Sequence, residues 1–490
     1  MIAVCSLVAA LALTLAAAAQ KLPPPPDLSH PPAIGPVQPY VPPVVHRDQL
    51  PNGLRIVVVE DHRFPLVTIE LALRAGATRL TPASAGLAQA EADLLTAGTP
   101  TRTSLQIAQD ADALGGSISA SVDSDFLTLA ASALSTRLQP LVALVADVAL
   151  HPAFPESEVA LEKNNLLQTL RADRADPNYL ASVQFAKLLF GDNPYAITAP
   201  TENSIAAISR QALATFHQQY FLPNNQAEIV VVGDVAAARA HNLVQQYFGD
   251  WRIGSPVPPP MPPVTPPNAR RIYLVDRPGS AQSVILLGSL GLTRTAPGYF
   301  PFLVANEVLG GSFNSRLMAD IRERKGYTYG IYSGNQPYRD LGAWSVQTQV
   351  RTAVTAPALA ETFKQLERMR AAPASEQELL QAKNYLAGNF VLGLQSQDAL
   401  ASEVITTGLY GLPPDRLATW VSDVQAVDAD TAFQAAQAII HPQHSIVVVV
   451  GDVQQIEAPL AQLVPGTVLP IFNAEGRQIG TFPSTPAAGH

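Results

Sequence analysis

Hydrophobic positions along this chain recur with two different periods, and each period predicts one kind of element. Short runs rich in β-branched residues predict strands at 54–60, 66–73, 271–275 and 282–290. Longer stretches with apolar residues three or four positions apart predict amphipathic helices at 136–150, 156–170, 357–370 and 376–394. This order of strands, helices and a closing strand predicts an α+β fold, in which helices pack on a mostly antiparallel sheet.

The same order of elements occurs twice, once in each half of the chain. Residues 226–235 read QAEIVVVGDV and residues 444–453 read HSIVVVVGDV, so each half ends in a β-branched strand that Gly-Asp closes. A short helix is predicted before each closing strand, at 210–220 and 428–440, and each half opens with paired strands. The sequence therefore predicts two tandem duplicated domains.

Two proline-rich segments mark the domain boundaries. Residues 21–45 predict an extended tether, and residues 254–269 predict a linker near the middle of the chain. The predicted domains are therefore 46–253 and 270–465. Residues 466–490 are predicted to form a short strand and a loose tail.

The first twenty residues predict a secretory signal peptide, because an apolar run ends there in small residues. No Lys or Arg precedes the run, and an uncleaved anchor helix is the alternative. Cys5 is the only cysteine and lies inside this segment, so the mature chain would have no disulfide and no cysteine-bound metal. We expect a periplasmic or secreted protein with no membrane span after cleavage.

Composition limits the class of partner. A hydrophobic content of 47% and a charged content of 14% indicate a folded chain with a large core. The formal net charge is −9, and no block of Lys or Arg occurs. Nucleic acid is therefore not an expected partner.

Residues 86–100, GLAQAEADLLTAGTP, look like a zinc-binding helix without its ligands. In the motif H-x-x-E-H, two histidines on one helical face bind Zn²⁺, and the glutamate polarises the attacking water. Here Gln89 and Asp93 stand at the histidine positions, and Ala92 stands at the glutamate position. The frame, Gly-Leu-Ala before these residues and Leu-Leu after them, resembles the insulinase/pitrilysin family of metallopeptidases in its mitochondrial-processing-peptidase branch.

The resemblance extends to the third zinc ligand, which in that family is the second glutamate of an E-x₆-E pattern on a later helix. Glu162 keeps the first glutamate, but Thr169 stands at the ligand position, and a threonine hydroxyl is a weak zinc ligand. We therefore expect no metal and no cofactor in this chain. An oxygen-rich site built from Gln89, Glu91, Asp93 and Glu162 is disfavoured against a plain polar face, because Glu91 points away from residues 89 and 93 on a helix.

The second half resembles the family where the first half does not. Residues 309–317, LGGSFNSRL, contain Gly310 and Gly311 and resemble the glycine-rich segment of the family's second domain. Arg322 and Tyr329 follow at the Arg-x₆-Tyr spacing that the family carries. The resemblance implies that both side chains reach substrate near the zinc, where an arginine fork and a phenol can bind a peptide carbonyl. The alternative is a surface ion-paired arginine and a strand tyrosine.

Together these features predict a non-catalytic subunit. It would pair with a homologous, zinc-bearing subunit and enclose a peptide-binding chamber, while the zinc stays in the partner. Arg322, Tyr329, Gly310 and Gly311 would face substrate bound at the partner's metal. Two alternatives remain open: a non-proteolytic scaffold or peptide-binding protein of the same fold, and an autonomous peptidase with an unorthodox site.

Overall fold

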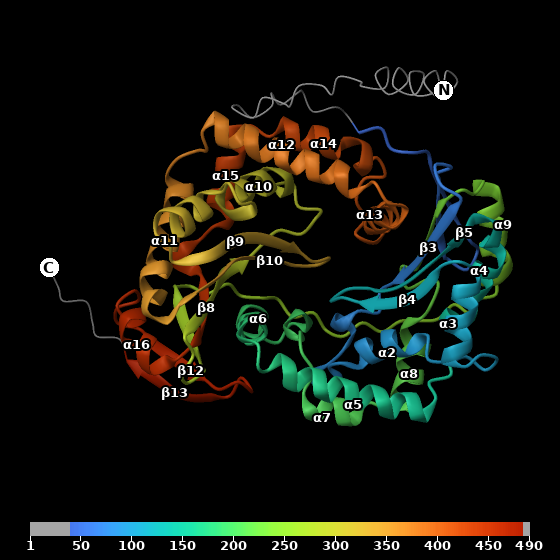
Figure 1. Ribbon diagram of the computed structural model, residues 1–490, viewed down its shortest axis with the longest axis horizontal. Coiled ribbons are helices and arrows are strands. Elements are labelled where there is room, and N and C mark those ends of the chain that lie inside the picture. The colour runs from blue at the N-terminus through green and yellow to red at the C-terminus, as the bar shows by residue number, and fades with distance from the viewer. Residues whose placement is uncertain (1–39, 484–490) are drawn as a thin grey trace, which may run out of the picture. The chain divides into compact units, whose positions relative to one another are not determined.

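Two β-sheets organise residues 40–483, the part of the chain that the computed structural model describes (Figure 1). The predicted signal peptide (1–20), most of the predicted tether (21–39) and the end of the predicted tail (484–490) lie outside these residues. The first sheet has the strand order β1-β2-β6-β3-β5-β4, and the second has the order β13-β12-β7-β11-β8-β10-β9.

The strands of the first sheet are β1 (Val45–Gln49), β2 (Arg55–Glu60), β3 (Leu66–Leu73), β4 (Ser117–Val122), β5 (Leu127–Leu134) and β6 (Glu228–Gly233). Those of the second sheet are β7 (Arg271–Asp276), β8 (Gln282–Leu290), β9 (Thr328–Pro337), β10 (Gly342–Arg351), β11 (Ile446–Gly451), β12 (Val468–Phe472) and β13 (Gln478–Pro483). The order β2-β6-β3-β5-β4 matches β7-β11-β8-β10-β9 strand for strand, and most neighbours are antiparallel. The predicted α+β fold with two duplicated domains is confirmed.

One detail of the predicted strand pairing is wrong. The two opening strands of each half do not pair, because the closing strand lies between them. In the first sheet β6 runs parallel to β2 and antiparallel to β3, and in the second β11 runs parallel to β7 and antiparallel to β8. Every residue of β6 and β11 is buried, and a continuous β-branched run of this kind is stable in the middle of a sheet that is covered on both faces.

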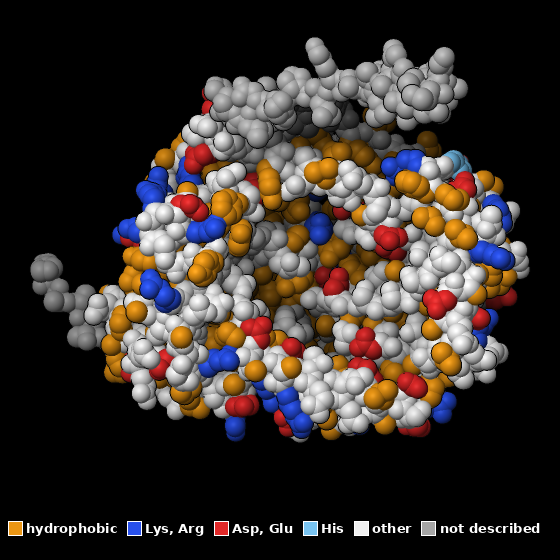
Figure 2. All heavy atoms as spheres, viewed as in Figure 1, with side chains coloured by type: hydrophobic (Ala, Val, Ile, Leu, Met, Phe, Trp, Pro, Cys, Tyr) orange, Lys and Arg blue, Asp and Glu red, His pale blue; other side chains and the backbone are white. Residues whose placement is uncertain are grey.

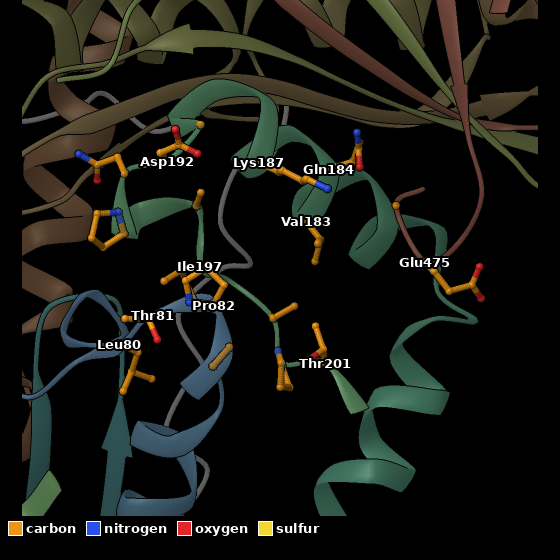
Figure 3. A pocket seen from close by; sticks show the side chains of 18 of the residues that line it. Leu80, Thr81, Pro82, Val183, Gln184, Lys187, Asp192, Ile197, Thr201 and Glu475 are labelled. Atoms are coloured by element: carbon orange, nitrogen blue, oxygen red, sulfur yellow. The ribbon is translucent and has the colours of Figure 1, made fainter. Parts of the chain in front are cut away.

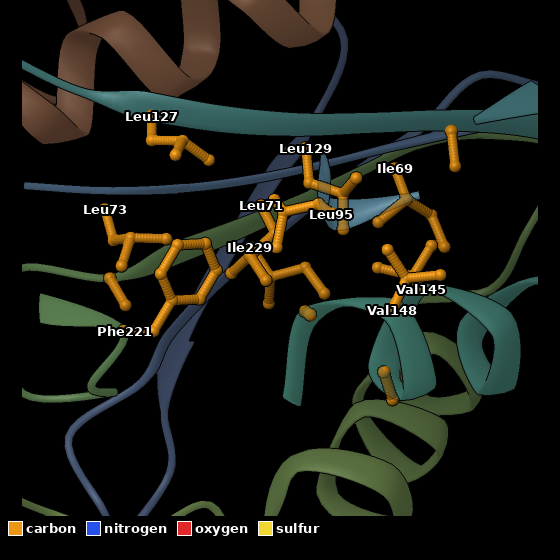
Figure 4. Packing of buried hydrophobic residues seen from close by; sticks show 14 of the residues in the cluster. Ile69, Leu71, Leu73, Leu95, Leu127, Leu129, Val145, Val148, Phe221 and Ile229 are labelled. Atoms are coloured by element: carbon orange, nitrogen blue, oxygen red, sulfur yellow. The ribbon is translucent and has the colours of Figure 1, made fainter. Parts of the chain in front are cut away.

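Helices cover both sheets. In the first half they are α2 (Leu87–Leu95), α3 (Ser104–Ala113), α4 (Leu138–Leu150), α5 (Glu156–Asp173), α6 (Pro177–Phe190), α7 (Glu202–Ala207), α8 (Arg210–Tyr220) and α9 (Ala237–Phe248). In the second half they are α10 (Tyr299–Asn306), α11 (Thr355–Ala371), α12 (Glu376–Gly393), α13 (Gln397–Leu409), α14 (Arg416–Ala426), α15 (Ala429–Ile439) and α16 (Val453–Ala461). Figure 4 shows the first core, where Val145 and Val148 of α4 meet Ile69 of β3 and Leu129 of β5.

One helix of each half packs on the sheet of the other half. Helix α6 packs on β8 and β11, so that Leu180 and Phe185 share a core with Val284 and Val448 (Figure 1). Helix α13 packs on β3 and β6, where Val404 joins the core of the first sheet. The predicted boundary between 253 and 270 is therefore a break in the sequence but not in the packing, because residues 40–483 belong to one compact unit.

Hydrogen bonds connect the turn between β9 and β10 to the first half. The phenol of Tyr195 donates a hydrogen bond to Asp125 at 2.6 Å, and the backbone N–H of Arg339 donates to the other carboxylate oxygen of Asp125 at 2.9 Å. The backbone N–H of Asp340 in turn donates to the Tyr195 oxygen at 3.1 Å. This arrangement fixes the hairpin of the second sheet against the first half.

The predicted short C-terminal strand is present as β12, but the predicted loose tail needs correction. The residues after β12 form a second strand, β13, which pairs antiparallel with β12, while β12 pairs in parallel with β7. The hairpin thus extends the second sheet at its edge. No helix within residues 40–483 is both long and apolar enough to cross a bilayer. Figure 2 shows charged side chains of both signs interspersed over the visible face, and the surface is hollowed near its centre.

Candidate functional site

The degenerate motif lies on α2 and borders a cavity of ≈ 600 Å³. Gly86 (φ +90°) precedes the helix, and α2 then packs beside α5. Gln89 and Asp93 on α2 and Thr169 on α5 all line this cavity, so the structure brings these three predicted positions together. Ala92 does not join them, because it is buried in the core on another face of α2.

Side chains in this cavity bond to one another. The amide nitrogen of Gln89 donates to both carboxylate oxygens of Asp93, at 3.0 and 2.9 Å. Glu162 on α5 lies against Asp93; burial, and secondly the negative charge of Asp93, raise the pKa of Glu162 to about 7. The cavity thus holds two neighbouring carboxyl groups, one of which keeps its proton up to near-neutral pH.

This donor set does not fit a zinc ion. Zinc sites use imidazole, thiolate and carboxylate ligands in tetrahedral arrangement, whereas the motif positions and Glu162 offer an amide, a hydroxyl and the Asp93–Glu162 pair. Across residues 40–483, no three His, Cys, Asp or Glu side chains are grouped so that they could hold a metal ion. Within residues 40–483, the motif positions therefore do not present a zinc-ligand set.

Glu91, the residue between the motif positions, has a structural partner instead. Its side chain is fully buried, and its Oε1 lies 2.7 Å from Nδ1 of His217 on α8. Burial raises the pKa of Glu91, and the hydrogen bond with His217 opposes the shift. The His217 ring stacks on Phe221 and meets Phe154 edge-on. Sequence reasoning expected Glu91 to point away from Gln89 and Asp93, but nothing in the sequence connects it to a residue 126 positions later.

Arg322 and Tyr329 lie in two consecutive elements of the second half, which a short connection joins. Arg322 belongs to a π-helical segment, Met318–Arg324, and Tyr329 lies in β9. The Arg322 guanidinium lies 4.4 Å from the centre of the Phe313 ring and 3.5 Å from a carboxylate oxygen of Glu323. Tyr329 is 92% exposed, so its phenol is open to a ligand. Neither residue borders the cavity at α2.

Gly310 and Gly311 end a second π-helical segment, Glu307–Gly311, where there is no room for a side chain. A Cβ atom on Gly310 would lie 2.6 Å from the hydroxyl of Ser333, and one on Gly311 would lie 2.2 Å from the Glu307 carboxylate. Gly310 is therefore required for close packing against β9, and Gly311 leaves room for the Glu307 side chain of its own segment. The structure assigns them these packing roles, and it places the exposed Phe313 on the loop that follows them.

Comparisons with known families agree with this geometry. Residues 55–196 match the family described as "Insulinase (Peptidase family M16)", and residues 207–386 match "Peptidase M16 inactive domain". The chain belongs to the insulinase family, peptidase family M16. The match to residues 55–196 includes α2 and α5, and the match to residues 207–386 includes Arg322 and Tyr329.

Curated M16 relatives and solved structures cover most of the chain. It is 29% identical over 362 residues to an uncharacterized zinc protease of Mycobacterium leprae, covering 74% of this chain and 81% of the relative. It is 25% identical to an uncharacterized zinc protease, YmxG, of Bacillus subtilis, covering 73% and 87%. The crystal structure of a peptidase M16 inactive domain from Pseudomonas fluorescens superimposes with a TM-score of 0.78 at 26% identity, covering 83% of this chain and 98% of that one. A protease from Helicobacter pylori, at 18% identity and a TM-score of 0.78, shares the fold.

Within this M16 fold, the carboxyl pair makes stability depend on pH. Unfolded Glu162 loses its proton near pH 4.5, whereas the folded group keeps it to about pH 7, so the free energy of unfolding should fall as pH rises between these values. Because the group is only partly buried, we expect a loss of about 1–2 kcal/mol. Urea unfolding at pH 4.5 and 7.5 measures it.

Glu162→Gln should remove most of this pH dependence, because glutamine has no proton to lose. Glu367→Gln on α11, where the glutamate is exposed, is the matched control and should leave the pH dependence unchanged. Equal pH dependence in the wild type and in Glu162→Gln would contradict the assignment.

Proposed function

We propose that this chain is a non-catalytic subunit of a zinc-metallopeptidase-like heterodimer. One observation carries the proposal: the M16 motif positions face a cavity in which Gln89, Asp93 and Thr169 replace ligands, while the Arg322/Tyr329 pair is kept with an exposed phenol. A chain without the metal but with the substrate-binding pair fits a division of labour between two homologous subunits. The relatives named as zinc proteases support the class of chemistry for the partner.

In this proposal the partner subunit binds the zinc and hydrolyses the peptide, and this chain holds the substrate. Arg322 presents a planar donor fork whose face is already packed on Phe313, so little side-chain freedom is lost when it binds a peptide carbonyl. Tyr329 presents a phenol as a second donor. The predicted signal peptide leads us to place the complex in the periplasm or outside the cell.

Co-expression tests the proposal. The chain alone should bind no stoichiometric zinc and cleave no peptide, whereas with a zinc-bearing M16 homologue from the same source it should form a heterodimer with chelator-sensitive peptidase activity. Size-exclusion chromatography, metal analysis and a quenched fluorescent peptide measure the three properties. Chelator-sensitive cleavage by the isolated chain, or no association with any such homologue, would refute the proposal.

One observation favours a second candidate, a non-proteolytic scaffold or peptide-binding protein. Arg322 already stacks on Phe313 and lies beside Glu323, which is also the environment of a purely structural surface arginine. A scaffold would assemble with its partner in the same way, but its Arg322 would make no difference to catalysis.

A further inference from the structure

The two helices that cross between the halves differ in the residues beneath them. Helix α6 packs on β8 and β11, and α13 packs on β3 and β6, which are the matching strands of the first sheet. None of α6, β8 and β11 contains an aspartate or a glutamate, whereas α13, β3 and β6 contain Asp398, Glu403, Glu70 and Glu228. The two contacts are equivalent in the duplicated fold, but only the one under α13 contains carboxyl groups.

The contact under α6 is apolar. Phe185 of α6 shares a core there with Val284 of β8. On another side α6 borders a cavity of ≈ 680 Å³, where Figure 3 shows Val183 of the helix together with Asp192 and Glu475. Both of these acidic residues are exposed. Carboxyl groups near α6 are therefore already in contact with water, and docking of the helix on its sheet buries none.

Glu70 of β3 lies beneath α13 and is only 5% exposed. Ser402 of α13 donates a hydrogen bond to its Oε1 at 2.7 Å, and Thr68 of β3 donates one to Asp398 of α13 at 2.6 Å. Burial raises the pKa of Glu70; the hydrogen bond from Ser402 opposes the shift, and the charge of Asp398 adds to it. The residues that pair with Glu70 on β5 and β6 are uncharged.

A second buried carboxyl group, that of Glu228 on β6, lies beneath the other end of α13. Gly408 of the helix passes so close that a Cβ atom there would lie 2.1 Å from both carboxylate oxygens. Burial raises the pKa of Glu228, and the positive charges of Arg55, at 2.9 Å on β2, and of Arg47 oppose the shift. The residue that pairs with Glu228 on β3 is Ala72. Docking of α13 thus covers two carboxyl groups, one near each end of the helix.

Glu403 of α13 itself belongs to the same system. Burial raises its pKa, and the charges of Arg294 and Arg416 oppose the shift. If α13 left the sheet, water would reach these carboxyl groups and their pKa values would return toward the ordinary value. A group whose pKa is raised in the docked state stabilises that state at low pH, and this contribution is lost as the pH rises through the raised pKa.

We propose that the contact of α13 with the first sheet is a pH-sensitive connection between the halves, which loosens as the carboxyl groups beneath the helix ionise. The α6 contact has no such groups and keeps the halves joined at every pH in this range. The chain would therefore hold its halves together through both helices in mild acid and chiefly through α6 in mild base. This inference does not depend on the proposed peptidase partner.

Hydrogen–deuterium exchange of the isolated full chain tests it, with mass spectrometry of peptic peptides that cover 397–409 and 177–190. Protection factors remove the direct effect of pH on the exchange chemistry and report local opening. Between pH 5 and pH 8, the protection of α13 should fall at least about tenfold more than that of α6. A parallel fall in the two helices would overturn the proposal.

Glu70→Gln gives a second, independent measurement. It keeps the size of the side chain and an acceptor for Ser402 but cannot ionise, so the extra fall at α13 should shrink at least threefold while α6 is unchanged. Glu376→Gln, at an exposed position in the first turn of α12, is the matched control and should behave like the wild type. An unchanged fall in Glu70→Gln, or an equal effect of Glu376→Gln, would overturn the proposal. The wild-type comparison of the two helices decides the question even if Glu70→Gln folds poorly.

Discussion

Replacing His217 with alanine is expected to lower the free energy of unfolding by about 3–5 kcal/mol, because it leaves the buried carboxyl group of Glu91 without its partner. Glu91 is fully buried, and its Oε1 lies 2.7 Å from His217 Nδ1. Its other oxygen, Oε2, already has no hydrogen-bond partner. Urea unfolding at neutral pH, followed by circular dichroism, measures the loss.

The pH dependence of this variant identifies the cause. Without His217, the pKa of Glu91, which burial already raises, should rise further. An acid whose folded pKa is raised contributes stability at low pH that is lost as pH rises, so the deficit of His217→Ala should be smaller at pH 5 than at pH 8.

Two further variants separate the buried charge from lost packing. Glu91→Gln combined with His217→Ala removes the charge and should recover part of the stability. His241→Ala is the matched control, since His241 pairs with Asp48 at 3.0 Å on the surface and should cost no more than about 1 kcal/mol. Equal losses in His217→Ala and His241→Ala would show that the buried pair adds little.

Arg322→Ala is expected to lower kcat of the assembled heterodimer by about 10²–10³-fold, the effect of removing one donor that stabilises developing negative charge. Arg322→Lys should restore little of the loss, because an ammonium lacks the planar fork and does not stack on Phe313 in the same way. Steady-state kinetics on a fluorogenic peptide measures both, and size-exclusion chromatography verifies that the heterodimer still forms.

Arg324→Ala is the matched control for this experiment. Arg324 lies two residues further along the same π-helical segment, is 65% exposed and pairs with Asp320 at 2.9 Å. Its loss should leave kcat unchanged. If Arg322→Ala also assembles normally with wild-type kcat, the scaffold function replaces the proposed one.

Local pattern was sufficient to predict many elements. The strands at 66–73 and 282–290 and the helix at 210–220 have the predicted bounds, because each is defined by its own hydrophobic period and its own end signals. The degenerate motif could also be predicted from the sequence. Gln89 and Asp93 are one helical turn apart, so the helix alone places them together.

Contacts between distant residues were not predictable in the same way. The sequence places Glu162 near the motif only through the family resemblance, and the pKa of about 7 depends on how deeply α5 buries it beside Asp93. The Glu91–His217 pair has no local signal. It depends on which helix packs against which, and single-residue spacing does not record that.

The sequence by itself determined the duplication, the α+β class and the absence of zinc ligands at the motif, because repeats, periodicity and residue type are properties of the chain. Only the tertiary structure decided that β6 and β11 insert between the opening strands, that α6 and α13 cross to the opposite sheet, and that the C-terminal hairpin extends the second sheet. The physical reason is that a strand or a helix face can be buried by several partners, and the choice among them is made by the packing of the whole unit.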